Sequence, residues 1–331
     1  MTNAANDEPP IDPARPIVDA HHHFWDYPVK PGRFLLHDLL QIMTGSGHRF
    51  THTVYAECHS MYRREGPEEL RPVGETEFVN GIAAMSASGM YGTCRIADGI
   101  VGSANLLLGD AVTPVLEAHL AAGGGRFRGV RMHTAWADAP LFGHPSDPAL
   151  RHVLREPRFA AGARALGRLG LVLDVWAIHP QLPDVIALAG ACPGTTIVLD
   201  HYGTPLDFGA YAHRKREVFD EWRAHLAALA RLPNVVVKLG GFGMDLTVPI
   251  CTHEGNAASA ALAPQWRPYI DVCVSAFGAA RCLFESNVPP DRAACPYGAL
   301  WNAYKLATAG CSEDEKDALF SATARRVYRL S

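Results

Sequence analysis

The amino-acid sequence predicts an α/β fold, a single-domain (β/α)8 barrel of the TIM type. Eight short apolar segments rich in β-branched residues recur along the 331-residue chain, and amphipathic segments separate most of them. Alternation of strands and helices favours a parallel sheet, and eight such units favour a closed barrel over an open sheet. The first segment is not followed by G-x-G-x-x-G, and the sequence contains no G-x-x-x-x-G-K-[ST], so the usual signatures of nucleotide-binding open sheets are missing.

The eight predicted strands are taken in chain order. They are Pro16–His21, Thr51–Glu57, Gly99–Leu108, Phe127–His133, Leu171–Ala177, Thr195–His201, Asn234–Gly240 and Arg281–Ser286. The amphipathic segments predict helices at residues 75–88, 111–125, 148–170, 182–194, 215–234, 263–280, 296–310 and 312–330. The last of these begins with a capping box, in which Ser312 is followed three residues later by Glu315.

Composition and charge exclude several classes of protein. The net charge of −4 comes without a basic stripe, so the chain carries no electrostatic footprint for nucleic acid. Its apolar runs fall far short of the roughly 20 residues that span a bilayer, and its first residues lack the pattern of a signal peptide. We therefore expect a cytoplasmic protein with a flexible leader (residues 1–15), a barrel domain (residues 16–331) and no membrane partner. The sequence leaves open whether it forms a homo-oligomer.

Seven of the predicted strands end in ionisable or amide side chains. The functional groups of such barrels lie at the carboxyl ends of the strands, and side chains alternate along a strand. On the first strand this alternation directs His21 and His23 into the barrel and turns His22 toward the wall. The other strands supply Glu57, His59, Arg131, His133, His179, Asp200, His201, Lys238, Glu285 and Asn287, and Asp291 follows the last of them.

Each of these residues alone has a structural interpretation, since a single histidine at a strand end is most often a hydrogen-bonded structural group. Unpaired buried polar groups cost about 1–3 kcal/mol each, however, so packing is a poor explanation for the whole set. The sequence therefore predicts a site at the carboxyl ends of the strands.

Six segments together resemble the amidohydrolase superfamily. They are VDAHHHFWD, GGGRFRGVRMHTAW, HPQLPDV, TTIVLDHYGTP, NVVVKLGGFGM and RCLFESNVPPDR. More narrowly, they resemble the amidohydrolase-2 group, which includes sugar lactonases and 2-pyrone-4,6-dicarboxylate lactonase. The resemblance spans about residues 16 to 330 and implies a distorted (β/α)8 barrel with hydrolase activity.

The resemblance implies a metal site made of histidines, if a metal is bound. Its ligands would be His21, His23, His179 and His201, and Zn²⁺ is the expected ion because neutral imidazoles suit zinc. In relatives an aspartate at the end of the eighth strand accepts a proton from the attacking water, but Asn287 stands at that position here. A metal-free mechanism, in which histidines polarise the carbonyl, therefore stays open beside a site with one divalent ion.

The leading hypothesis is a hydrolase that opens a lactone of a small, carboxylate-bearing organic acid by attack of water. In it His21, His23 and His201 bind the reacting carbonyl and stabilise the oxyanion, directly or through a metal ion. Glu285 is ranked above Asp291 as general base. The candidate catalytic residues are His21, His23, His201, Glu285, Asn287 and Asp291.

Arg131 and Lys238 are expected to anchor a carboxylate or the hydroxyl groups of the substrate, Arg131 by a two-pronged contact. The candidate substrate-binding residues are Glu57, Arg131, His133, His179, Lys238 and Trp25. Two alternatives remain. One is a metal-dependent, non-oxidative decarboxylase of an aromatic or muconate-type acid, and the other is a barrel that binds a small ligand without turnover.

Overall fold

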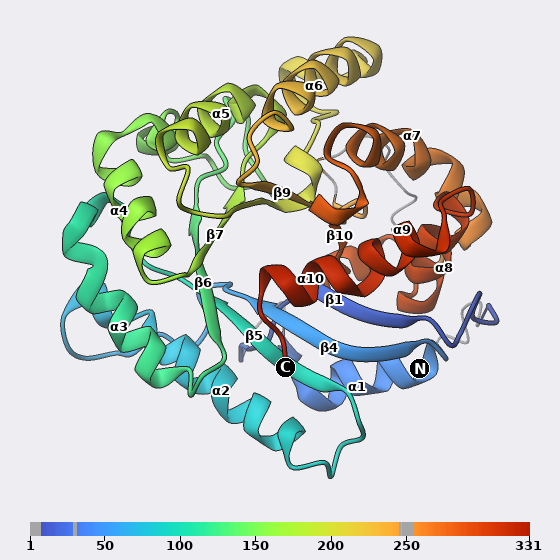
Figure 1. Ribbon diagram of the computed structural model, residues 1–331, viewed down its shortest axis with the longest axis horizontal. Coiled ribbons are helices and arrows are strands. Elements are labelled where there is room, and N and C mark those ends of the chain that lie inside the picture. Colours follow the sequence, from blue (N-terminus) through green and yellow to red (C-terminus); the bar gives the residue numbers. More distant parts are fainter. Residues whose placement is uncertain (1–7, 29–31, 245, 247–254) are drawn as a thin grey trace.

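The computed structural model describes residues 8–28, 32–244, 246 and 255–331. Eight parallel strands form one sheet in the order β1-β4-β5-β6-β7-β8-β9-β10. Backbone hydrogen bonds from Asn287 N–H to His21 O (2.9 Å) and from His23 N–H to Val288 O (2.9 Å) join the segment after β10 to β1. The sheet therefore curves back onto itself with helices around it, as Figure 1 shows, and the predicted (β/α)8 barrel is confirmed.

The strands agree closely with the prediction except at two places. Their bounds are β1 Pro16–His22, β4 Arg49–Ala56, β5 Arg95–Gly102, β6 Phe127–His133, β7 Val172–Trp176, β8 Ile197–Leu199, β9 Val235–Leu239 and β10 Cys282–Phe284. The predicted strand Gly99–Leu108 is wrong in its second half, because Leu106–Val112 forms a 3-10 helix whose first turn is capped by the Asn105 side chain. The predicted strand Thr195–His201 ends early, and Asp200–Gly203 forms a 3-10 turn.

The helices lie around the sheet and follow the predicted segments, with one addition. Their bounds are α2 Val73–Ala87, α3 Thr113–Ala122, α4 Pro157–Arg168, α5 Leu182–Ala191, α6 Lys215–Leu229, α7 Ser259–Phe277, α8 Tyr297–Ala307, α9 Glu313–Asp317 and α10 Thr323–Val327. The sequence did not predict the short hairpin β2 (Trp25–Asp26) and β3 (Arg33–Phe34), nor helix α1 (Leu36–Gly45) after it. Among the described residues, every helix is too short or too polar to span a bilayer.

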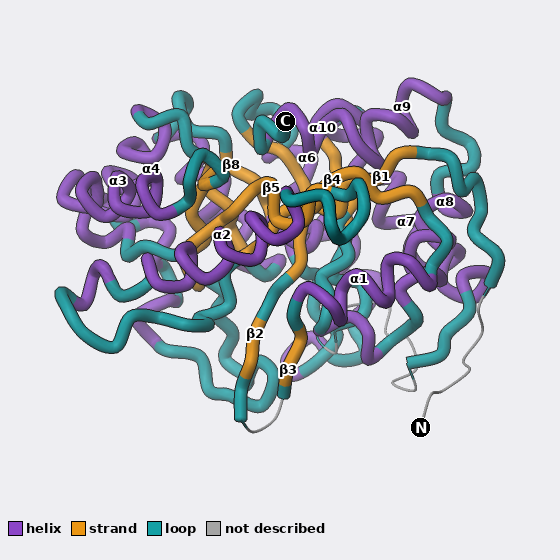
Figure 2. Tube along the Cα trace, turned by 90° about the horizontal axis from the view of Figure 1, so that it is seen from below, coloured by secondary structure: helices purple, strands orange, loops and turns teal. Residues whose placement is uncertain are grey.

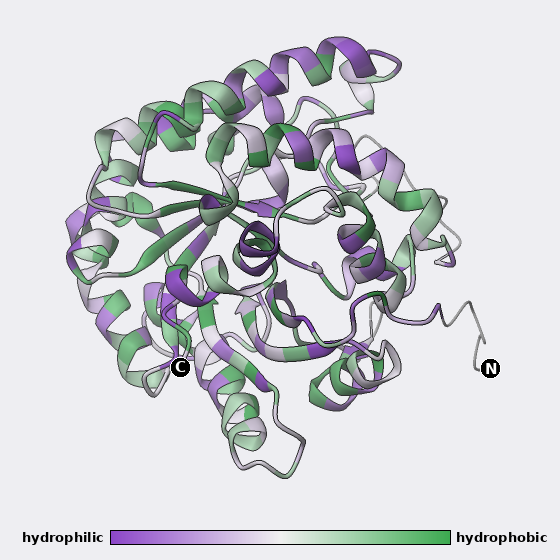
Figure 3. Cartoon of the chain, turned by 45° about the vertical axis from the view of Figure 1, so that its right-hand side comes forward, coloured by the Kyte–Doolittle hydropathy of each residue, from purple (hydrophilic) through white to green (hydrophobic). Residues whose placement is uncertain are grey.

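At the end of the barrel that the C-terminal segment covers, the inside is filled mainly by small and β-branched side chains. Val18, Ala20, Val54, Val101, Val172, Val198, Val236 and Leu283 form one buried cluster with Tyr328 and other residues of the C-terminal segment. Figure 3 shows the strands largely in the hydrophobic colour. In Figure 2 the C-terminal helix α10 and the β2–β3 hairpin lie on opposite sides of the sheet, so the C-terminal segment covers one end of the barrel. Functional side chains must therefore lie toward the other end.

The described part of the predicted leader, residues 8–15, is held against the helices. The Ser259 N–H donates to Glu8 (2.7 Å), the Ile11 N–H donates to Asn302 (2.8 Å), and Arg15 pairs with Glu313 and Asp317 at the two ends of α9. Residues 1–7 of the leader lie outside the described residues.

Candidate active site

Next to the apolar cluster, toward the carboxyl ends of the strands, lie three buried charges and a tyrosine hydroxyl. We call this layer the ionic floor; its residues are Asp174, Asp200, Lys238 and Tyr328. Lys238 Nζ lies 2.6 Å from Asp174 Oδ2 and 3.1 Å from Asp200 Oδ1. The Tyr328 hydroxyl donates to Asp174 (2.9 Å), and the Lys238 ammonium lies 5.5 Å from the centroid of its ring. Burial raises the pKa of Asp174 to about 6. Burial would also raise the pKa of Asp200, but Lys238 and Arg131 outweigh it and hold that pKa below its ordinary value.

The position of Lys238 differs from its predicted place at the barrel mouth. Its side chain is completely buried, and its charge is balanced by two carboxylates below the mouth. Burial would lower the pKa of Lys238, but Asp174 and Asp200 outweigh it and raise that pKa, so the side chain stays cationic. The structure therefore gives Lys238 the contacts of an internal counter-ion.

On top of the floor, the Glu285 carboxylate joins two imidazoles. Its Oε1 lies 2.6 Å from His201 Nδ1, and its Oε2 lies 2.9 Å from His21 Nδ1. Burial would lower the pKa of His201, but Glu285 outweighs it, so this pKa is raised. Burial and then the charges of Lys238 and Arg131 lower the pKa of His21 far below its ordinary value. The pair therefore combines one imidazole that gains a proton readily with one that stays neutral.

Two glycines after β9 make room for this arrangement. A Cβ atom on Gly240 would lie 2.2 Å from Glu285 Cγ, and one on Gly241 would lie 2.7 Å from His201 Nδ1. Gly241 also has a φ of +71°, in the left-handed region that glycine tolerates best. His201 itself has a φ of +52° and Asn287 a φ of +51°. Such backbone strain concentrates at functional sites, where surrounding contacts hold it.

The next layer is formed by His23, Glu57 and Arg131. Arg131 Nε donates to Glu57 Oε1 (2.9 Å), and its NH1 group lies 3.2 Å from His21 Nε2. His23 Nδ1 lies 2.8 Å from the Ala56 carbonyl oxygen, which can only accept, so the Nδ1 carries the proton. His23 Nε2 then carries a lone pair, and this nitrogen lies 3.2 Å from His21 Nε2.

The histidine triplet on β1 divides as the alternation predicts. His22 turns to the wall, where its Nε2 lies 2.7 Å from Thr53 Oγ1 and its ring packs on Phe24. The same alternation would put Asp19 on the inner face beside His21, but this expectation is wrong. The pairing of β1 with β4 shifts register between Asp19 and His22, so Asp19 lies on the outer face and accepts from the hydroxyl of Tyr297 on α8 (2.9 Å).

These side chains meet a cavity of about 200 Å³, which we call the mouth. Its lining residues are His23, Glu57, Cys58, His59, Arg131, His133, Phe142, Trp176, His201, Met244, Asn287 and Pro290. A cavity of this size suits a small organic molecule. Sequence analysis did not single out Cys58, Phe142, Met244 and Pro290, because loops carry no periodic pattern that places their side chains.

Several candidate residues lie around the mouth without lining it. Trp25 stacks on His23, with ring centroids 6.2 Å apart. Asp291 is buried behind Asn287 and accepts from its Nδ2 (2.7 Å) and from the Gly243 N–H (3.0 Å), and burial raises its pKa to about 7. Asp291 is thus placed to orient Asn287.

His179 lies away from the other histidines. Its ring packs on Tyr211 (centroids 4.6 Å apart), and its Nδ1 accepts from the Leu206 N–H (3.2 Å). Burial, together with the charges of His225 and Arg214, lowers the pKa of His179 to about 3. None of its described contacts involves the cluster around Glu285, because the chain turns into a 3-10 helix directly after β7.

The donor atoms beneath the mouth fit one divalent cation. Nitrogen and oxygen atoms of His21, His201 and Glu285 lie within 4.8 Å of one another. Two imidazoles and a carboxylate are a ligand set that zinc commonly takes, and the Nε2 lone pair of His23 lies next to it. Among the described residues, the group that could hold a metal ion thus contains Glu285 and not His179, which the ligand set predicted from the sequence included.

A family model described as Amidohydrolase matches residues 18–330. The chain belongs to the amidohydrolase family. This confirms the resemblance that the six sequence segments carry.

Relatives cover almost the whole chain. The protein y4mH of Sinorhizobium fredii is 30% identical, over 95% of this chain and 98% of its own length. An L-fucono-1,5-lactonase of Burkholderia multivorans is 28% identical, over 95% of this chain and 96% of its own. A crystal structure of a Burkholderia multivorans amidohydrolase with bound zinc has a TM-score of 0.70 at 26% identity, covering 95% of this chain and 99% of that chain. The family and these relatives support a hydrolase.

Proposed function

We propose that this amidohydrolase opens a lactone ring of a small organic acid by adding water to its carbonyl carbon. The observation that carries the proposal is the Glu285–His201 pair, whose histidine lines the mouth beside the Arg131 guanidinium. Such a pair is a proton acceptor of the kind that ester hydrolysis needs. The lactonase names of two relatives support a lactone as the ester that is opened.

The proton of the attacking water goes to His201 in this proposal. Its Nδ1 is held by Glu285, so Nε2 is the ring nitrogen left to accept a proton. The Glu285 carboxylate then stabilises the imidazolium, and it acts through His201 because it is fully buried and does not line the mouth. The imidazolium next returns the proton to the ring oxygen as the C–O bond breaks, which leaves a hydroxy acid.

Arg131 stabilises the negative charge that develops on the carbonyl oxygen. Burial would lower its pKa, but Glu57 and Asp200 outweigh it and raise that pKa, so Arg131 keeps its charge. His23 is not a donor to this oxygen, because the proton of its neutral ring points to the Ala56 carbonyl. Its Nε2 instead accepts from a hydroxyl of the substrate, and the Trp25 ring stacked on it fixes its plane. His133 and Asn287 line the mouth and contact the rest of the substrate.

The proposal holds with or without one divalent metal ion. An ion held by His21, His201 and Glu285 would supply polarisation of the carbonyl and a lower pKa for water. Decarboxylation is the weaker alternative, since Asn287 stands where the aspartate of metal-dependent relatives is expected.

A panel of lactones tests the proposal. The purified chain, metal-stripped and then reloaded with zinc, is given 1,4- and 1,5-lactones of sugar acids, including L-fucono-1,5-lactone, and acid release is followed with a pH indicator. We expect turnover of at least one lactone, with a loss of about 100-fold or more in His201→Ala. Absence of turnover with and without zinc would contradict the proposal, and release of CO₂ from aromatic acids would favour the decarboxylase.

A further inference from the structure

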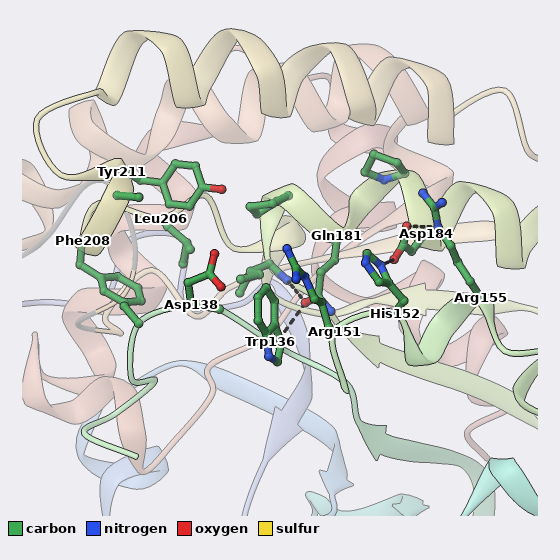
Figure 4. Close-up of a pocket in the computed structure, with 16 residues that line it drawn as sticks. Trp136, Asp138, Arg151, His152, Arg155, Gln181, Asp184, Leu206, Phe208 and Tyr211 are labelled. Atoms are coloured by element: carbon green, nitrogen blue, oxygen red, sulfur yellow. Dashed lines mark hydrogen bonds and ion pairs between the residues drawn. The ribbon is translucent and has the colours of Figure 1, made fainter. Parts of the chain in front are cut away.

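A second cavity of about 290 Å³ lies at the carboxyl ends of β6, β7 and β8, beside the mouth. Among the described residues, the two cavities have no lining residue in common. Three segments that follow these strands, and the segment that leads into α4, form its walls (Figure 4). The mechanism proposed above uses none of these side chains, so the cavity needs a separate explanation.

The walls of the second cavity are apolar, aromatic and held in place. Trp136, Leu206, Phe208 and Tyr211 are the largest apolar side chains of its lining. In Figure 4 the last three lie on one side of Trp136. Gln181 fixes the Trp136 wall, because its Oε1 accepts from the Trp136 N–H (3.0 Å) and its Nε2 donates to the Thr134 carbonyl oxygen (2.9 Å). A flat ring is the shape that stacks best in such a cavity.

Two opposite charges on this lining have no ion-pair partner among the residues that the structure describes. Asp184 forms an ion pair with Arg155, and His152 Nδ1 lies 3.2 Å from its carboxylate. The Arg151 guanidinium lies 4.9 Å from the centroid of the Trp136 ring and forms no ion pair with any described residue. Asp138 likewise forms no ion pair with a described residue, and it lies on the Leu206 side of Trp136 in Figure 4. The lining of the cavity thus carries an exposed cation on Trp136 and an exposed anion, neither of which forms an ion pair within the described part of the chain.

We propose that this cavity is a binding site for a ring compound with a carboxylate at one end and an ammonium group at the other. The ring stacks between Trp136 and the aromatic side chains opposite, the carboxylate binds Arg151, and the ammonium binds Asp138. A ligand with only a carboxylate would be repelled by Asp138, and one with only an ammonium would be repelled by Arg151. The site is independent of the lactonase proposal.

Calorimetric titration of the full chain with three matched probes tests this site. The probes are para-aminomethylbenzoate, para-toluate, which lacks the ammonium, and benzylamine, which lacks the carboxylate. We expect para-aminomethylbenzoate to bind about 10-fold or more tightly than either, because each charge adds a charge-assisted contact. Arg151→Gln should abolish its advantage over benzylamine, and Asp138→Asn its advantage over para-toluate.

Two control variants locate the binding. Arg158→Gln changes an exposed arginine of α4 outside the cavity, and His23→Ala changes the mouth; both should leave the affinity unchanged. Equal affinities for the three probes, no saturation by roughly 10 mM, or loss of binding in His23→Ala would each overturn the proposal. These readouts need no turnover, so they separate this site from the fate of the lactonase proposal.

Discussion

The ionic floor and the mouth are both built from charged side chains, yet they differ in how those charges are satisfied. In the floor, Lys238 contacts Asp174 and Asp200, Tyr328 contacts Asp174, and none of the four residues lines the mouth. In the mouth, His201 and Arg131 are held from behind by carboxylates and keep part of each group toward the cavity. The type of residue at a strand end therefore says less about its role than the direction of its partners.

The largest expected effect comes from breaking the floor. Lys238→Met removes the ion-pair partner of buried Asp174 and leaves Asp200 with Arg131, 3.5 Å away, and we expect it to lower the free energy of unfolding by about 3–5 kcal/mol. Urea denaturation measures the change. Lys215→Met is the control, because Lys215 is exposed and pairs with Asp207 at 3.3 Å, and it should cost about 1 kcal/mol or less. Equal losses in the two variants would show that Lys238 is not the counter-ion of the floor.

The next effect compares Glu285, which holds the proton-accepting His201, with Asp291, which holds Asn287. Glu285→Gln removes the charge that holds His201, so we expect kcat to fall by about 100-fold or more with little change in stability. Asp291→Asn should cost far less, since Asp291 contacts Asn287 and Gly243 behind the mouth. Steady-state rates of both variants on the lactone that the panel identifies give the comparison. A larger loss in Asp291→Asn would contradict the proposal that the Glu285–His201 pair handles the proton.

The histidine triplet also allows a residue that lines the mouth to be compared with a neighbour that packs in the wall. His23→Ala removes a group that lines the mouth and should abolish most activity while the fold survives. His22→Ala removes a ring that packs on Phe24 in the wall, so it should reduce stability and leave activity within about 10-fold of the wild type. Steady-state rates and melting temperatures of both variants show which variant loses activity and which loses stability. Equal losses of activity would contradict the opposite orientations of the two side chains.

Sequence periodicity predicted the barrel and most of the mouth, because both depend on regular strands. The alternation on β1 placed His22 and His23 on opposite faces, but it failed for Asp19, since a register shift has no signature in the sequence. Asp174 carried a usable signal, because it is the one charged residue in the apolar segment Leu171–Ala177. His179 was misplaced because its position depends on a turn that follows β7. Contacts made through turns and bulges need the three-dimensional fold.

Glu75 on α2 supports the segment next to the mouth, and it is as buried as the floor but forms no ion pair with any described residue. Its Oε1 accepts from the Tyr55 hydroxyl (2.8 Å) and from the N–H groups of Cys58 and Ser60 (2.9 Å each), which holds the segment after β4. Burial, and then the charge of Glu57, raise the pKa of Glu75 from 4.5 to about 7. A carboxyl group of this kind binds its proton more tightly in the folded state than in the unfolded state.

The sign of the resulting pH dependence follows from that difference. The stability that Glu75 contributes is present below pH 4.5 and is lost as the pH rises toward about 7. We expect the free energy of unfolding of the wild type, relative to Glu75→Gln, to fall across this window, as urea denaturation at several pH values would measure. The glutamine carbonyl can still accept from the Tyr55 hydroxyl and the loop N–H groups, so this variant removes the titration and keeps those contacts. Glu77→Gln, an exposed neighbour whose pKa is lowered by its hydrogen bond to Arg63, should show no change there. A flat difference for Glu75→Gln as well would mean that the buried carboxylate is neutralised by a group outside these contacts.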